Sequence, residues 1–183
     1  LPAGYHARAT GTAEEYAESM NSLFFAIGLA ILIVYMLLAS QFDSLLHPFT
    51  IMFALPPAMV GALLALLITG YTINIMSVIG IILLFGLVTK NSILLVDLTI
   101  QKQETGLDRE AALREACPIR LRPILMTAVS MIFGVLPVAL ALGEGGEARA
   151  PMAVATMGGM ITSTFLTLVL VPAVYSLFHP DRK

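Results

Sequence analysis

The sequence has few charged residues, one cysteine and no tryptophan. Asp, Glu, Lys and Arg make up 12% of its 183 residues, against roughly 25% in an ordinary soluble domain. The single cysteine, Cys117, excludes an internal disulfide framework and a metal site built from several cysteines. Hydrophobic residues make up 58% of the chain and the mean hydropathy is +0.90, so the composition predicts an integral membrane protein.

The motifs of common enzyme and cofactor sites are also missing from the sequence. His6, His47 and His179 lie in the N-terminal arm or at the ends of apolar runs, with no cysteine or acid at ligand spacing. Residues 143–147 form an acidic turn that is unsuited to holding phosphate. We therefore expect that the protein is not an enzyme, that it has no resident metal or organic cofactor, and that it binds no nucleic acid.

Five apolar segments are long enough to cross a bilayer, whose hydrocarbon core of about 30 Å takes about 20 helical residues to span. The spans are predicted near residues 23–39, 49–68, 75–98, 124–142 and 152–178. Residues 1–21 are predicted to hold a short N-terminal periplasmic arm and the start of a projecting helix. Residues 22–179 then form the transmembrane domain, and residues 180–183 a cytoplasmic tail. The predicted fold is an all-α membrane bundle of five transmembrane helices.

Basic residues are concentrated on one side of the predicted bundle. The connections of residues 69–74 and 143–150 hold a single basic residue, Arg149. The other side carries Lys102, Arg109, Arg114, Arg120 and Arg122 in the connection of residues 101–122, and Arg182 and Lys183 at the C-terminus. Because short cytoplasmic loops are rich in Lys and Arg, we expect the N-terminus in the periplasm and the C-terminus in the cytoplasm.

Residues 107–117 predict a short cytoplasmic helix that lies along the membrane surface. Asp108 suits its first turn, and Glu110 and Arg114 have the spacing of an ion pair on one helix face. A solvated linker helix is the simpler interpretation, and a regulatory role is the alternative.

Prolines and small residues inside the spans predict closely packed helices. Pro56-Pro57, Pro137 and Pro172 each remove a backbone donor, which transmembrane helices tolerate when neighbours satisfy the freed carbonyls. Small residues that let helix backbones approach one another recur at a spacing of four: Ala54, Ala58 and Ala62 in one span, and Gly158 with Thr162 and Gly159 with Ser163 in another.

Lys90 is a positive charge in the middle of an apolar run. A charge at that depth costs about 2.5 to 3.5 kcal/mol on insertion scales. Lys90 can lower this cost by extending its long side chain toward the cytoplasmic interface, or it can have a partner. The neighbouring Thr89, Asn91 and Ser92 favour a partner, because they indicate a polar patch that faces other helices rather than lipid.

Three further residues belong with Lys90 as candidates. Asp97 projects from nearly the same face about 10 Å along the helix, although a charge at the membrane boundary is its simpler interpretation. Thr127 lies one heptad after Arg120 and on its face. Arg120 and Arg122 alone would indicate positive-inside anchors. Lys90 and Thr127 at comparable depth are a more specific indication of a polar site inside the spans.

No acidic residue lies deep enough in the spans to neutralise Lys90. The acids between residues 23 and 178 all fall in loops or at span ends: Asp43, Asp97, Glu104, Asp108, Glu110, Glu115, Glu144 and Glu147. A partner for Lys90 is therefore expected from another polypeptide or from a part of the protein outside this sequence. Residues 1–21 lack the pattern of a signal peptide, and we expect the chain to be a fragment of a longer protein.

Several motifs resemble the C-terminal membrane half of resistance-nodulation-division (RND) efflux pumps, specifically of the hydrophobe/amphiphile exporter branch. They are the run Gly86-Leu87-Val88-Thr89-Lys90-Asn91-Ser92-Ile93-Leu94-Leu95-Val96-Asp97, the run Arg120-Leu121-Arg122-Pro123-Ile124-Leu125-Met126-Thr127, Pro151-Met152-Ala153 with Gly158-Gly159, Ser40-Gln41-Phe42-Asp43-Ser44 and Leu55-Pro56-Pro57. The resemblance covers essentially the whole chain.

The resemblance implies a multi-pass protein of the bacterial inner membrane, whose residues 1–11 end the periplasmic porter region. It implies that Lys90 pairs with aspartates of the N-terminal half and that Arg120 and Thr127 complete a proton relay, with Asn91 and Asp97 as possible supporting groups. The implied activity is proton/substrate antiport, with the proton as coupling ion. The implied partners are the N-terminal half, further copies in a homotrimer, a periplasmic adaptor and an outer-membrane channel.

Two other interpretations remain open on the sequence. The chain could be a membrane scaffold or truncated fragment that does not transport, or it could belong to an RND relative that exports lipids or assists protein export.

Overall fold

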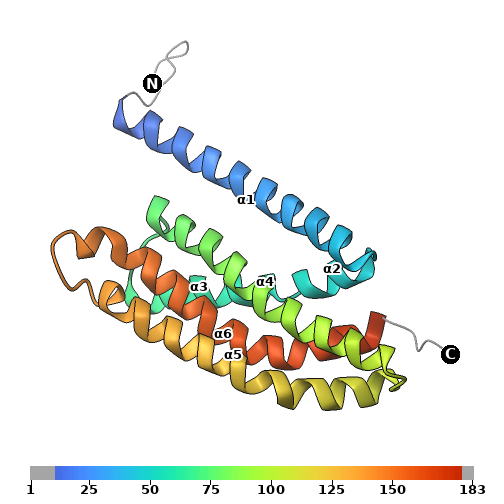
Figure 1. Cartoon of the computed structure of the whole chain (residues 1–183). Coiled ribbons are helices and arrows are strands. Elements are labelled where there is room, and N and C mark those ends of the chain that lie inside the picture. The colour runs from blue at the N-terminus through green and yellow to red at the C-terminus, as the bar shows by residue number, and fades with distance from the viewer. Residues whose placement is uncertain (1–10, 179–183) are drawn as a thin grey trace, which may run out of the picture.

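The computed structural model describes residues 11–178, and in this range the chain forms helices and no strand. The helices are α1 (Thr12–Phe42), α2 (Leu46–Met52), α3 (Leu55–Thr69), α4 (Ile75–Glu104), α5 (Arg109–Ala139) and α6 (Gly146–Phe178) (Figure 1). The all-α fold predicted from the sequence is confirmed. The N-terminal arm up to residue 10 and the tail of residues 180–183 lie outside the described residues.

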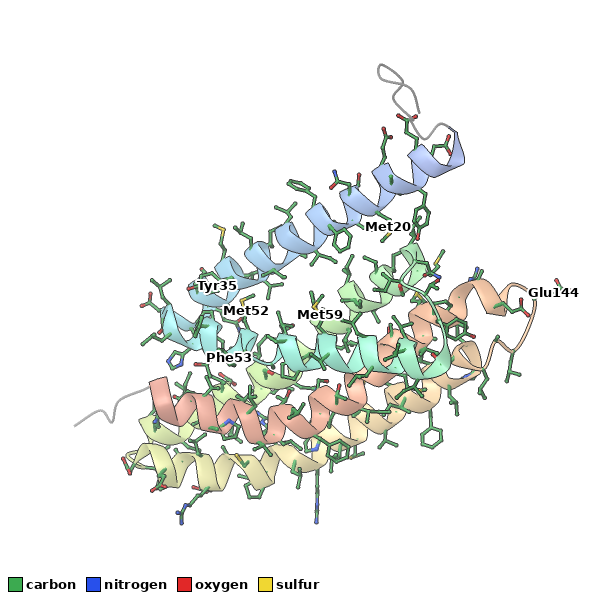
Figure 2. The ribbon with its side chains drawn as sticks, turned by 180° about the vertical axis from the view of Figure 1, so that it is seen from behind. Met20, Tyr35, Met52, Phe53, Met59 and Glu144 are labelled. Atoms are coloured by element: carbon green, nitrogen blue, oxygen red, sulfur yellow. The ribbon has the colours of Figure 1, made fainter. Side chains whose placement is uncertain are left out.

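Five helical segments are long and apolar enough to cross a membrane, as predicted: Glu14–Phe42, Leu46–Thr69, Ile75–Glu104, Glu110–Ala139 and Gly146–Tyr175. The turn between α4 and α5 and the end of α6 lie at one end of the bundle, and the turn between α5 and α6 lies at the other (Figure 1). Glu144 marks this second end in Figure 2. The basic and the acidic connections of the sequence therefore lie at opposite ends.

The second span consists of two helices, which corrects the prediction of one helix near residues 49–68. α2 ends at Met52 and α3 begins at Leu55. Pro56 and Pro57 have no N–H to donate to the carbonyls four residues earlier, so the helical hydrogen bonding is interrupted there. Both prolines instead lie in the first turn of α3, where a backbone N–H has no partner within the helix.

The fourth span is longer than predicted, because it includes the residues expected to form a separate cytoplasmic helix. Helices are predicted near residues 107–117 and 124–142, but the structure has one continuous helix, α5. Its interior prolines each remove one backbone hydrogen bond, which a packed transmembrane helix tolerates. No glycine between residues 117 and 124 ends the helix. The predicted pair of Glu110 with Arg114 is present at 3.7 Å.

Helix α6 is the centre of the packing, because α3, α4 and α5 all lie against it (Figure 1). The contacts are so close that added methyl groups would not fit. A Cβ on Gly80 of α4 would lie 2.5 Å from the carbonyl oxygen of Met152 on α6, and one on Gly159 of α6 would lie 2.8 Å from the carbonyl oxygen of Ala58 on α3. The close packing predicted from the small residues is confirmed.

Helix α1 lies apart from this packed unit (Figure 1). Among its described side chains only Leu38 is buried, and large apolar ones such as Phe25 are exposed. Its C-terminal end turns into α2 at Asp43, whose φ is 45°, and the hydroxyl of Tyr35 donates to the carbonyl of Leu45 at 3.3 Å. Figure 2 shows Tyr35 at this end of α1, close to Met52. The contacts of α1 are therefore concentrated at one end.

Candidate functional site

The predicted site lies on α4, whose start is fixed by local hydrogen bonds. The side-chain oxygen of Asn74 accepts from the backbone N–H of Ser77 at 2.8 Å, and Ser77 Oγ accepts from the N–H of Asn74 at 2.8 Å. This reciprocal capping box defines the first turn. Lys90 then lies near the middle of the 30-residue helix, roughly 20 Å from each end.

Lys90 belongs to an exposed stripe of α4, which we define by Leu83, Gly86, Lys90, Asp97 and Gln101. All but Asp97 are exposed, and Asp97 is half-buried. The steps of three, four and seven residues place them on one helix face. Lys90 forms no hydrogen bond or ion pair with any residue that the structure describes. The face of α4 that carries the lysine is thus directed away from the packed helices.

The polar neighbours of Lys90 are satisfied within α4. The buried hydroxyl of Thr89 donates to the carbonyl oxygens of Phe85 at 2.8 Å and Gly86 at 3.1 Å. The buried hydroxyl of Ser92 donates to the carbonyl of Val88 at 3.2 Å. Asn91 is half-buried. Thr89 and Ser92 face other helices, as predicted, but their protons are not available to a group beside Lys90.

Arg120 lies on the packed face of α5. Ala116 and Ile124, four residues before and after it along the helix, and Leu113, seven residues before it, are all buried. The Nε atom of Arg120 is buried as well and has no hydrogen-bond partner within residues 11–178. Arg120 as a whole is half-buried, so part of its surface stays accessible.

Thr127 is exposed although it lies on the same face as Arg120. Its hydroxyl donates to the carbonyls of Pro123 at 3.0 Å and Ile124 at 2.9 Å. Toward any further group, Thr127 can therefore act only as a hydrogen-bond acceptor. Lys90, Arg120 and Thr127 do not form hydrogen bonds with one another in the described structure. The structure therefore leaves Lys90 and Thr127 exposed and Arg120 half-buried, and does not join the three residues.

A second polar cluster lies at the end of the bundle that holds the turn between α4 and α5. Lys102 Nζ lies 2.6 Å from Glu115 Oε1 and joins α4 to α5. The hydroxyl of Tyr175 on α6 donates to Gln103 Oε1 on α4 at 3.1 Å, and the ring of His47 stacks on that of Tyr175 with centroids 5.8 Å apart. Sequence reasoning missed these contacts, because partners 13 and 72 residues apart leave no local signal.

The arrangement supplies charge and hydrogen-bond capacity rather than a metal or catalytic centre. Within the described residues, no group of three His, Cys, Asp or Glu side chains could hold a metal ion. What the site does offer is a lysine without a counter-ion among residues 11–178 and a partly buried arginine, both on helices apolar enough to cross a membrane. Such groups are costly in lipid and are typical of ion pathways.

A family model describing the AcrB/AcrD/AcrF family matches residues 1–179. The chain belongs to this family. Its resemblance to RND efflux pumps, drawn from the sequence motifs, is thereby confirmed. The chain is 41% identical over 183 residues to the multidrug resistance protein MdtC of Klebsiella pneumoniae (strain 342), and 42% identical over 175 residues to MdtC of Salmonella schwarzengrund (strain CVM19633).

Solved structures give the same result for the fold. The crystal structure of a heavy metal efflux pump (crystal form II) superposes with a TM-score of 0.81 at 34% identity, over 95% of this chain and 18% of that one. The match to the Klebsiella protein covers 100% of this chain and 18% of the relative. The chain thus spans less than a fifth of the length of these relatives, and it corresponds to part of their membrane region.

Proposed function

We propose that this chain is the C-terminal membrane half of an RND efflux transporter driven by the proton-motive force. In this proposal Lys90, Arg120 and Thr127 are its share of the proton relay. The observation that carries the proposal is the position of Lys90, which lies at the centre of a membrane-crossing helix, exposed and without a counter-ion among residues 11–178. A lysine in that position is stable only if another group neutralises or hydrates it.

The N-terminal half of the same transporter supplies this group as aspartate side chains. The chain is less than a fifth of its relatives in length, so most of a full-length protein is available to cover the exposed stripe of α4. The buried Nε of Arg120 needs an acceptor as well. Separate carboxylates of the N-terminal half can serve the two cations, and the hydroxyl oxygen of Thr127 can accept a hydrogen bond from one of them once it is protonated.

Proton binding changes the balance of charge at this site. While the partner acids are ionised, Lys90 is attracted to them, and protonation removes that attraction. Lys90 then changes partner, and α4 and α5 can move relative to the helix that carries the acids. The two conformations drive export only if they bind the proton with different affinity. The coupling ion is the proton, and no cofactor and no enzymatic reaction are involved.

The membrane placement follows from the charges. The basic end of the bundle lies in the cytoplasm, the N-terminus in the periplasm, and the five spans lie in the lipid bilayer of the bacterial inner membrane. The complete transporter assembles as a homotrimer with a periplasmic adaptor and an outer-membrane channel, as the resemblance to RND pumps implies.

Replacing the lysine tests the proposal directly. In the full-length transporter, Lys90→Ala is expected to reduce proton-driven export to background, while expression and assembly are retained. Arg114→Ala is the matched control, because the Arg114 side chain is 80% exposed and lies outside the relay. Normal export by a stably assembled Lys90→Ala variant would contradict the proposal.

A transport-inactive scaffold or fragment is the second candidate, favoured by the lack of a polar partner for Lys90 among residues 11–178. Co-expression with the missing N-terminal part separates the two. Export restored by co-expression supports a functional half, and assembly without export supports a scaffold. A cargo assay with lipid or a secreted protein identifies a relative that exports lipids or assists protein export.

A further inference from the structure

A second ionisable residue lies on the exposed stripe of α4, and the relay of Lys90, Arg120 and Thr127 does not use it. Asp97 follows Lys90 by seven residues, so the two lie on nearly the same face, about 10 Å apart along the axis. Another seven residues lead to Glu104, which is exposed and is the last residue of α4. Asp97 therefore lies midway between the centre of the span and the basic end of the bundle.

The carboxylate of Asp97 is oriented but is not held in an ion pair. Its Oδ2 accepts a hydrogen bond from Gln101 Nε2 at 2.9 Å, and the residue is half-buried. The lysine at this end of α4, Lys102, is engaged by Glu115 at 2.6 Å.

The other described ionisable groups on α4, and those on the helices packed against it, do not bond to Asp97 either. They are Lys90 and Glu104 on α4, Glu14, Glu15, Tyr16, Glu18, Tyr35 and the C-cap residue Asp43 of α1, His47 on α2, Glu110, Arg114, Cys117, Arg120 and Arg122 on α5, Glu147, Arg149 and Tyr175 on α6, and Tyr71 in the turn before α4.

We propose that Asp97 is the site through which protons leave the relay toward the basic end of the bundle, with Gln101 as a positioning residue. This inference rests on the proposed function. A protonated partner acid near Lys90 gives its proton to water on the exposed stripe, and this water passes a proton to the Asp97 carboxylate. The resulting neutral acid then releases a proton to water at the end of α4. One proton enters and one leaves, only O–H bonds form and break, and the carboxylate is regenerated.

Water has to connect the two positions, because about 10 Å is several times the reach of a direct hydrogen bond. We place this water between the exposed stripe of α4 and the part of the full-length transporter that covers it. Gly86, Lys90 and Gln101 are exposed along the stripe, and Asp97 keeps part of its surface accessible. A residue that only marked the membrane boundary would not need an oriented carboxylate on the same face as the central lysine.

The test uses the full-length transporter in proteoliposomes. Transport is driven by a potassium-diffusion potential, so that adding a weak acid does not remove the driving force. Asp97→Ala is expected to lower the transport rate about 10-fold or more, since a positioned proton-transfer group commonly contributes at least that much. Formate, a small carboxylate that can occupy the space left by the side chain, is expected to restore part of the rate. Asp97→Glu should retain most of it.

Two controls separate this inference from a structural role of Asp97. Glu104→Gln should transport like the wild type, because bulk water reaches the end of α4 directly. Asp97→Ser is measured in parallel with Asp97→Ala. If one of the two variants assembles poorly, the other still tests the inference. Wild-type transport rates in both Asp97→Ala and Asp97→Ser overturn the inference. A slow Asp97→Ala variant whose rate formate does not restore overturns it as well.

Transport by the Lys90→Ala variant is measured in the same experiment. If that variant transports normally, the proposed function fails whatever Asp97 does. If Lys90→Ala is inactive while Asp97→Ala transports normally, only the inference about Asp97 fails.

Discussion

Two glycines of α4 allow the helix packing to be tested with the same substitution. Gly80 lies against α6, where an added Cβ would be 2.5 Å from the carbonyl oxygen of Met152 and 3.0 Å from its Cα. Gly86, six residues later, has nothing within 4 Å of an added Cβ. Both are helical, so replacing either by alanine brings the same gain in helix propensity, about 0.5 to 1 kcal/mol.

The difference between the two variants therefore isolates the contact with α6. Backbone atoms cannot rotate away as a side chain can, and overpacking of this kind typically costs 1 to 3 kcal/mol. Moving α4 outward also weakens the hydrogen bond from Thr156 Oγ1 to the carbonyl of Gly80, now 3.2 Å long, a bond worth about 0.6 kcal/mol in a membrane. Gly80→Ala should thus be less stable than Gly86→Ala by about 2 kcal/mol or more.

The measurement is the free energy of unfolding of each variant of this chain in mixed detergent micelles, by SDS titration followed with circular dichroism. Equal stability of the two variants, within about 0.5 kcal/mol, would refute the account of α4 and α6 as closely packed backbones.

Two further predictions concern the polar cluster at the basic end. Tyr175→Phe removes the hydroxyl that donates to Gln103, and we expect a loss of about 1 kcal/mol in the same unfolding assay; an unchanged midpoint would show that water replaces the bond. Lys102 and Glu115 are 27% and 48% exposed, so a double-mutant cycle with alanine should give a coupling energy of about 0 to 1 kcal/mol. A coupling above about 2 kcal/mol would mean that the pair is shielded from water in a way its exposure does not indicate.

The spans could be predicted from length and hydropathy alone, because crossing a membrane requires a minimum number of apolar residues. The helix ends could not. Pro56-Pro57 was interpreted as a tolerated kink, but two adjacent residues without N–H groups interrupt the second span. The short helix near residues 107–117 and the span near residues 124–142 are separate in the prediction, yet α5 is continuous, because isolated prolines each remove only one hydrogen bond.

The sequence was sufficient to predict that the candidate site lacks a partner for Lys90. Counting the acids of the sequence was enough to show that Lys90 has no partner deep in the spans, and in the described structure the lysine has none. The burial of Arg120 Nε and the link between Gln103 and Tyr175 were not predictable. Both depend on how α4, α5 and α6 are oriented about their axes, and a sequence with small residues on several faces does not determine this rotation.

The central position of α6 has a consequence for how the protein is made. The helix that α3, α4 and α5 all pack against is synthesised after all three of them. Membrane helices insert individually before they associate, so the earlier helices must wait in the bilayer with the surfaces around Gly61 and Gly80 uncovered. A nonsense mutation or ribosomal stop before Gly146 would leave these helices inserted but unassembled, and exposed to membrane proteases. Synthesis and insertion of α6 is thus the step that commits these helices to their packed arrangement.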